Sequence, residues 1–202
     1  DIALSLSRLR AVVDFDVANL TVTVQAGLTL AELQDRLSRA NQFLPLNPPL
    51  PAQATIGGTV AANASGPGRF RYGSARDLVL GMRVALANGK IIHVGGKTVK
   101  NVAGYDLSKV FIGSYGTLGI ITEVTFRLLP SPQVRQLLSA VFDSLEMALN
   151  WVMQVMDSEL LPTSLTALDQ RATQLVFRDS ADIGGCALII SLDGSAETVE
   201  RQ

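Results

Sequence analysis

Two different periodicities follow one another near the start of the chain. Residues 20–25 read LTVTVQ and alternate polar with apolar positions, as a half-buried strand does. Residues 30–40 instead place leucine at every third or fourth position, which is the spacing of one helical face. Thr29 precedes this segment and Glu32 follows three positions later, the pattern of a capping box. The pattern therefore predicts a strand, a short turn and a helix.

Further short strands are predicted in the middle of the chain. Residues 79–86 and 90–94 are apolar runs separated by a segment that contains Asn88-Gly89, a strong signal for a β-hairpin. Residues 120–128 alternate again before a proline ends the run. Because few helices separate these strands, we expect an α+β architecture and not a doubly wound sheet.

The pattern changes near residue 131, where glycines become sparse. Residues 137–142 read as a strand, and Asp143 with Glu146 suggests a second capping box. Apolar positions then recur at helical spacing, and we interpret them as core residues rather than cofactor contacts. These positions are Met147, Ala148, Trp151, Val152, Val155 and Met156.

Three more strands and a last helix are expected towards residue 202. The strands are predicted at residues 164–168, 174–177 and 187–192, and Ser195 is expected to cap the helix. The order β-α-β-β-α resembles an incomplete ferredoxin-like sandwich. We therefore expect two domains, one over residues 1–130 and the other over residues 131–202.

Composition narrows the possible classes of protein. Apolar residues make up 48% of the 202 residues and charged residues only 17%, which excludes intrinsic disorder. No apolar run approaches the length of a membrane span, and no export signal is apparent. With Cys186 as the single cysteine and His93 as the single histidine, neither an internal disulfide nor a structural zinc site is expected.

The net charge of −1 conceals a strong asymmetry along the chain. The segment from Thr55 to Gly119 holds eight Lys or Arg against two carboxylates, together with 13 of the 17 glycines. Glycines and cations in one segment are typical of a binding site for a phosphate-bearing ligand, in which the main chain and the cations contact the anion. On charge alone, a solvated basic face is an equally good interpretation. Nucleic acid is a weaker candidate, because aromatic residues are only 5% of the chain.

The common nucleotide motifs are missing, so any nucleotide must be bound by another scaffold. Neither the dinucleotide fingerprint Gly-x-Gly-x-x-Gly nor a P-loop is present. The segment from Gly113 to Thr122 differs from an ordinary hairpin loop, since glycines at a spacing of three run directly into a β-branched strand. Such a loop lets a flat ring or a phosphate approach the main chain.

Several motifs in consecutive order resemble the FAD-linked oxidases of the vanillyl-alcohol oxidase type, whose flavin domain is called PCMH-type. Within that family the string from Lys100 to Leu107 is most similar to the FAD-binding subunits of bacterial glycolate oxidases. The motifs are Thr55-Ile56-Gly57-Gly58, Ala61 to Gly66, Tyr72-Gly73, Arg76-Asp77, Lys100 to Leu107 and Gly113 to Thr122.

The resemblance implies a PCMH-type FAD-binding domain, lacking most of its first subdomain, and the start of a ferredoxin-like cap. It implies FAD as cofactor, no metal and no identified catalytic residue. The implied cofactor-binding residues are Pro49, Thr55, Ile56, Gly57, Gly58, Asn63, Ala64, Ser65, Gly66, Gly73, Gly113, Gly116, Gly119, Ile120 and Ile121. The candidates for binding anionic groups are Arg69, Arg71, Lys97 and Lys100, with an ordinary solvent-facing side chain as the alternative interpretation of each.

The resemblance also implies an activity and partners. The expected reaction is oxidation of a 2-hydroxy acid such as glycolate, with hydride passing from the substrate α-carbon to flavin N5. Electrons would leave through a hetero-oligomer with a homologous flavoprotein subunit and an iron–sulfur subunit, in the cytoplasm or at the inner face of the membrane through those partners. The alternatives are a non-catalytic flavin-binding or assembly subunit, and a nucleotide-binding regulator. The chain is expected to be truncated at both ends.

Overall fold

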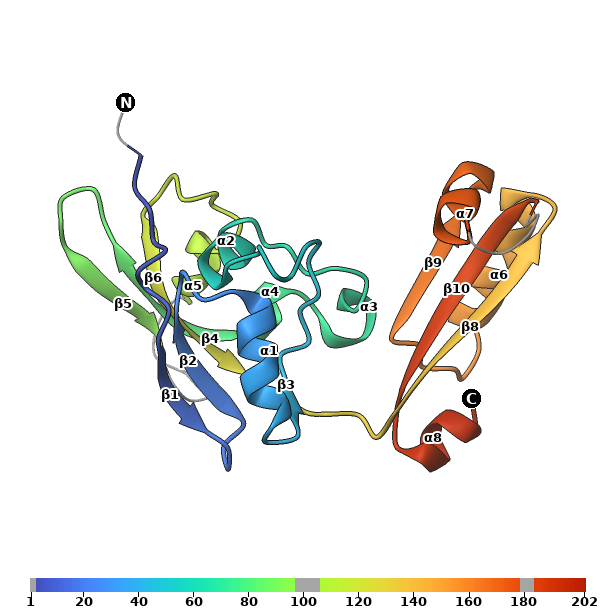
Figure 1. Cartoon of the computed structure of the whole chain (residues 1–202), viewed down its shortest axis with the longest axis horizontal. Coiled ribbons are helices and arrows are strands. Elements are labelled where there is room, and N and C mark those ends of the chain that lie inside the picture. Colours follow the sequence, from blue (N-terminus) through green and yellow to red (C-terminus); the bar gives the residue numbers. More distant parts are fainter. Residues whose placement is uncertain (1–2, 97–105, 179–183) are drawn as a thin grey trace. The chain divides into compact units, whose positions relative to one another are not determined.

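The computed structural model describes residues 3–96, 106–178 and 184–202, which form two compact units. The first unit comprises Asp1–Gly66 and Gly73–Ser131, and the second comprises Pro67–Tyr72 and Pro132–Gln202. Each unit contains an antiparallel sheet with helices (Figure 1). The predicted α+β class is therefore confirmed.

The first unit is built on a five-stranded antiparallel sheet in the order β1-β2-β6-β4-β5. Two further strands of two residues each, β3 and β7, pair with each other in a separate small sheet. The strands are β1 (Val12–Asp16), β2 (Thr21–Gln25), β3 (Gln42–Phe43), β4 (Val79–Ala85), β5 (Ile91–Gly95), β6 (Ile120–Arg127) and β7 (Leu129–Pro130). The helices of this unit are α1 (Leu30–Ser38), α2 (Ile56–Ala61), α4 (Ala75–Leu78) and α5 (Ser108–Phe111).

One face of this sheet forms the hydrophobic core with the helices. Alternation along β2 and β6 directs Val22, Val24, Val124 and Phe126 into that core, where all four are almost completely buried. The helices contribute the leucines of α1 and Ile56 and Val60 of α2. The other face carries polar pairs, such as the hydroxyls of Thr23 and Thr125 at 2.9 Å. The core thus holds α1 and α2 against one face of the sheet.

The predicted capping box at the start of α1 is confirmed. The Thr29 hydroxyl accepts a hydrogen bond from the Glu32 backbone N–H, and the Glu32 carboxylate accepts from the Thr29 backbone N–H at 3.1 Å and hydroxyl at 2.9 Å. These bonds hold the pKa of the Glu32 carboxyl below its ordinary value of about 4.5, the Thr29 backbone N–H contributing most.

This lowered pKa predicts a dependence of stability on acid pH. The stabilisation from ionised Glu32 is fully present above about pH 4.5 and is lost as the pH falls through the lower pKa of the folded state. We expect Glu32→Gln to flatten the decline of the thermal unfolding temperature over that range, as followed by circular dichroism. Thr29→Val, which removes the hydroxyl that donates to the Glu32 carboxylate, should flatten the same decline in part. Parallel curves for wild type and Glu32→Gln would contradict this prediction.

The second unit contains a three-stranded antiparallel sheet in the order β8-β10-β9. Placing the third strand between the first two is the arrangement of a split βαβ unit, so the predicted ferredoxin-like topology is confirmed. The elements are α3 (Arg69–Tyr72), β8 (Val134–Phe142), α6 (Leu145–Met156), β9 (Ser164–Leu168), α7 (Gln170–Val176), β10 (Cys186–Gly194) and α8 (Ala196–Glu200).

Two local predictions in this unit are wrong. Residues 174–177 were expected to be a strand but belong to α7 and its C-terminus, because Asp169 caps a helix there by accepting from the Ala172 N–H at 2.7 Å. The cap of α6 is Ser144, whose hydroxyl accepts from the Met147 N–H at 3.2 Å. The expected box of Asp143 with Glu146 is displaced by this neighbouring hydroxyl, since the extended backbone of Ser144 places its hydroxyl within reach of the first turn.

The apolar residues of α6 are only partly core residues, which corrects a further expectation. Ala148 and Val155 are buried, whereas Trp151 is 51% exposed and Met147 and Met156 are similarly exposed. Helical spacing identified the apolar positions but not which of them the three-stranded sheet covers. None of the helices in the described ranges is both long enough and apolar enough to cross a bilayer.

Candidate functional site

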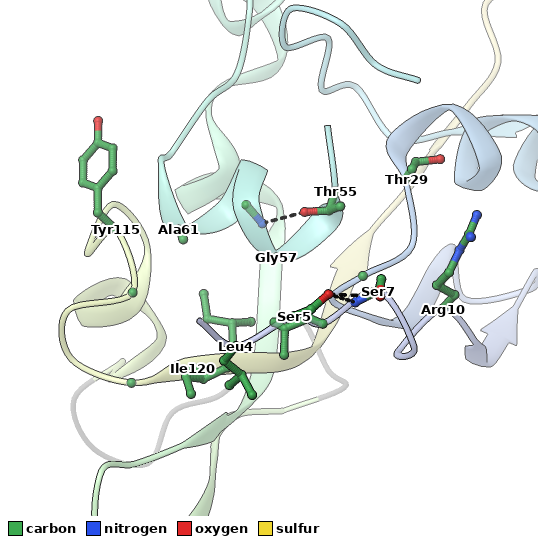
Figure 2. Close-up of a pocket in the computed structure, with 16 residues that line it drawn as sticks. Leu4, Ser5, Ser7, Arg10, Thr29, Thr55, Gly57, Ala61, Tyr115 and Ile120 are labelled. Carbon is green, nitrogen blue, oxygen red and sulfur yellow. Dashed lines mark hydrogen bonds between the residues drawn. The ribbon is translucent and has the colours of Figure 1, made fainter. Parts of the chain in front are cut away.

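A cavity in the first unit has a volume of about 620 Å³, which is within the usual range for small-molecule sites. Four segments of the chain line it: the segment before β1, the residues just before α1, the residues at and within α2, and the loop that leads into β6 (Figure 2). Its lining residues are Leu4, Ser5, Leu6, Ser7, Arg10, Gly27, Thr29, Thr55, Gly57, Gly58, Ala61, Tyr115, Gly116, Gly119, Ile120 and Ile121.

The cavity brings together the two glycine-rich motifs, although nearly 60 residues separate them in sequence. Backbone hydrogen bonds from Gly113 N–H to the Val60 carbonyl (3.1 Å) and from Tyr115 N–H to the Ala61 carbonyl (2.9 Å) fasten the loop to α2. These bonds place Gly116 and Gly58 on the lining of one cavity. The main chain of both motifs can therefore approach the same ligand, while the N–H groups of Gly57 and Gly58 donate within the protein, to the Ala26 carbonyl (2.8 Å) and the Thr55 hydroxyl (3.3 Å).

Neighbouring glycines of α2 meet different surroundings. A Cβ at Gly57 would lie 2.7 Å from the Ala26 Cβ, so the absence of a side chain there allows α2 to pack on the residue after β2. A Cβ at Gly58 would meet only the Thr55 hydroxyl, at 3.0 Å. Gly57 thus serves packing as well as the lining, whereas Gly58 leaves space on the cavity side.

Seven of the fifteen residues assigned to cofactor binding line this cavity, and eight do not. Ile56 is in the hydrophobic core, and Pro49, the residues from Asn63 to Gly66, Gly73 and Gly113 lie outside the lining. The lining residues are Thr55, Gly57, Gly58, Gly116, Gly119, Ile120 and Ile121.

The residues that follow α2 have structural contacts that explain their identities. A Cβ at Gly66 would lie 2.1 Å from the Asn47 carbonyl oxygen, and the Ser65 hydroxyl accepts from the Ala75 N–H at 3.2 Å. Asn63 lies beside Gly113 and has a buried side-chain oxygen with no described hydrogen-bond partner. A buried acceptor of this kind is compatible with a ligand that donates a hydrogen bond.

The Tyr72-Gly73 and Arg76-Asp77 motifs are also occupied by contacts within the protein. The Tyr72 hydroxyl donates to the Asp193 carboxylate at 3.2 Å, and burial, followed by this carboxylate, raises the pKa of Tyr72. Asp77 accepts from the Ser74 backbone N–H and hydroxyl, and these bonds hold the pKa of Asp77 below its ordinary value. Both motifs therefore have a structural role.

Of the four cations proposed from the sequence, Arg69 and Arg71 lie in the described part of the chain, and neither lines this cavity. Arg69 and Arg71 belong to α3 in the second unit, where Arg71 donates to the Asp193 carbonyl. Their role in binding anions stays a prediction. Lys97 and Lys100 lie outside the described residues, as does most of the motif from Lys100 to Leu107. Among the described residues, the one charged side chain on the lining is Arg10. Sequence reasoning missed Arg10 because it lies before the glycine-rich segment.

The lining fits a nucleotide-containing cofactor in its chemistry. Leu4, Ala61, Ile120 and Ile121 supply apolar surface for a ring, the glycines allow a ligand to approach the main chain closely, and Arg10 supplies a positive charge. A flat ring joined to phosphate needs these three features together.

Family models match both parts of the chain. Residues 1–95 match the FAD binding domain, and residues 131–202 match the C-terminal domain of FAD linked oxidases. The alkyldihydroxyacetonephosphate synthase structure superposes with a TM-score of 0.82 and 26% identity, covering 96% of this chain and 38% of that one. The fold and these matches therefore define a PCMH-type FAD-binding domain and a unit with ferredoxin-like topology that belongs to the C-terminal domain of FAD linked oxidases.

The chain belongs to the FAD-linked oxidases, and its cofactor is FAD. It is 38% identical to glycolate oxidase subunit GlcD of Bacillus subtilis over 99% of this chain and 43% of that protein. It is 44% identical to glycolate oxidase subunit GlcE of Escherichia coli over 61% of this chain and 36% of that protein. It is 38% identical to a D-lactate dehydrogenase of Archaeoglobus fulgidus over 80% of this chain and 36% of that protein. The chain spans less than half the length of these relatives.

Proposed function

We propose that the protein is an FAD-dependent oxidoreductase of 2-hydroxy acids, of the glycolate or D-lactate type. The observation that carries the proposal is the single cavity shared by the two glycine-rich motifs, in a chain that matches the models of FAD-linked oxidases. Relatives named as glycolate oxidase subunits and D-lactate dehydrogenases support the choice of substrate class.

We assign the binding of FAD to residues 1–130 and the covering of the substrate to residues 131–202. Thr55, Gly57 and Gly58 would hold the cofactor from one side and Gly116 to Ile121 from the other. When bound, FAD supplies N5 as the acceptor of the hydride from the substrate α-carbon. The described lining contains no carboxylate or imidazole, so we assign no proton acceptor from it.

The proposal is tested with the full-length gene product purified under anaerobic conditions. We expect the absorption bands of oxidised flavin and their bleaching when glycolate, D-lactate or D-2-hydroxyglutarate is added. An acid without the 2-hydroxyl, such as acetate, should leave the bands unchanged. A protein that binds no flavin even after incubation with FAD would contradict the proposal.

A second candidate function is a flavin-binding or assembly subunit without its own substrate oxidation. It is favoured by the similarity to two differently named glycolate oxidase subunits, and by apolar side chains exposed on the second unit. These include Leu137, Leu138 and Val141 on β8 and Leu149, Trp151 and Met153 on α6.

For this second function, the proposed partners are a homologous flavoprotein subunit and an iron–sulfur subunit. The complex would lie in the cytoplasm, or these partners would hold it at the inner face of the membrane. Flavin that is bleached by substrate only after such subunits are added would favour the second function. Bleaching of the isolated protein would favour the first. A nucleotide-binding regulator would bind ATP without flavin colour.

A further inference from the structure

Arg10 occupies one end of the cavity, held by an ion pair. Its guanidinium donates to the Glu32 carboxylate, which is its hydrogen-bond partner among the described residues. Glu32 is itself fixed by the capping box with Thr29. In Figure 2, Arg10 and Thr29 lie at the side of the cavity away from Tyr115, with Ser5, Thr55 and Gly57 between them.

The Glu32 contact orients the guanidinium without using all of its donors. Arginine has five N–H groups in a planar fork, and this fork matches phosphate oxygens better than a lysine ammonium does. The carboxylate of Glu32 already accepts two hydrogen bonds from Thr29, so its position is set independently of Arg10. The Arg10 side chain is 53% exposed, so solvent or a ligand can reach it.

The remainder of the described lining is neutral, so Arg10 is the side chain there that can balance an anion. We infer that Arg10, positioned by Glu32, donates charge-assisted hydrogen bonds to the diphosphate of FAD bound in this cavity. This inference rests on the proposed binding of FAD and assigns a residue outside the glycine-rich motifs. Hydrogen bonds between arginine and phosphate are among the stronger ones in proteins.

The test separates the diphosphate from the flavin ring. Apoprotein of the full-length gene product is titrated with FAD and with riboflavin, which has the ring but no phosphate, and affinity is read from flavin fluorescence. We expect Arg10→Gln, which keeps part of the side-chain stem, to weaken FAD binding about 10- to 100-fold and to change riboflavin binding less than about twofold. Displacement of FAD by ADP should weaken in parallel. Inorganic phosphate alone should compete poorly in both proteins.

Two further variants control the test. Arg10→Lys keeps the charge but loses the fork, so its FAD affinity should fall between those of wild type and Arg10→Gln. Arg39→Ala removes an exposed arginine that pairs with Asp35 on α1, away from the lining, and should bind FAD as wild type does. Raising the salt concentration should weaken FAD binding to wild type more than to Arg10→Gln.

Equal losses for FAD and riboflavin, or no loss for FAD, would overturn the inference. If Arg10→Gln binds FAD as tightly as wild type, FAD binding itself is still supported, so the proposed function remains but Arg10 has no role in binding the diphosphate. Failure of the wild type to bind either flavin would instead overturn both. Efficient competition by inorganic phosphate that depends on Arg10 would assign the site to a free anion and likewise overturn the inference.

Discussion

Gly66→Ala is expected to destabilise the first unit by about 3 kcal/mol or more. Gly66 has φ +73°, and a Cβ there would lie 2.1 Å from the Asn47 carbonyl oxygen and 2.7 Å from its carbonyl carbon. The left-handed backbone costs about 1 kcal/mol for alanine, and the collision with main-chain atoms adds the cost of a backbone shift. Urea unfolding of the full-length gene product, followed by circular dichroism, measures the change.

Gly89→Ala is the matched control for the collision. Gly89 has φ +80° in the hairpin between β4 and β5, but no heavy atom would lie within 4 Å of its added Cβ. The free energy of unfolding of this variant should fall only by the cost of the left-handed backbone, about 1 kcal/mol. Equal losses for the two variants would show that Asn47 yields easily, and that the glycine of this motif is not required by packing.

Gly57→Ala and Gly58→Ala are expected to act on different properties although the residues are adjacent. The new methyl at Gly57 would press on the buried Ala26, so the free energy of unfolding should fall by about 1–3 kcal/mol. Gly58→Ala should change the free energy of unfolding by less than about 1 kcal/mol, since alanine is favoured over glycine in a helix. Its methyl enters the cavity side, so FAD affinity should fall instead.

A larger side chain at Gly58 sharpens this contrast. Gly58→Leu should weaken FAD binding by about tenfold or more, because the side chain occupies space that the cofactor needs. Flavin fluorescence titration gives the affinity and urea unfolding gives the stability of the same preparations. The assignment of this cavity to FAD fails if Gly58→Leu is folded and binds FAD as tightly as wild type.

Local patterns predicted β2, α1, β4, β5 and β6 of the first unit, because the signals for these elements are short-range, but they did not predict β1 or the short helices α2, α4 and α5. The turn between β4 and β5 depends on Asn88, whose side-chain oxygen accepts from the Lys90 N–H at 3.0 Å, and on the adjacent Gly89. The start of α1 depends on Thr29 and Glu32. In each case the residues that specify the structure are within three positions of one another, so the sequence displays them together.

The errors arose where two local signals compete. Asp143 and Ser144 are both suitable caps, and only the backbone path decides that the serine hydroxyl reaches the first turn of α6. The short apolar run at residues 174–177 suits a strand or a helix end, and the upstream Asp169 cap decides for the helix.

The sequence alone determined the elements that have a strong local pattern, the α+β class and the two glycine-rich motifs, since neighbouring residues specify each of these. Only the tertiary structure decided that both motifs share a cavity and that Arg10 joins them there. It also decided that Gly66 is required by Asn47. These relations join residues that are distant in the chain. They arise where loops fold back onto other parts of the chain, as the backbone hydrogen bonds of Gly113 and Tyr115 to α2 and the contact of Gly66 with Asn47 show, and no local periodicity or spacing predicts such contacts.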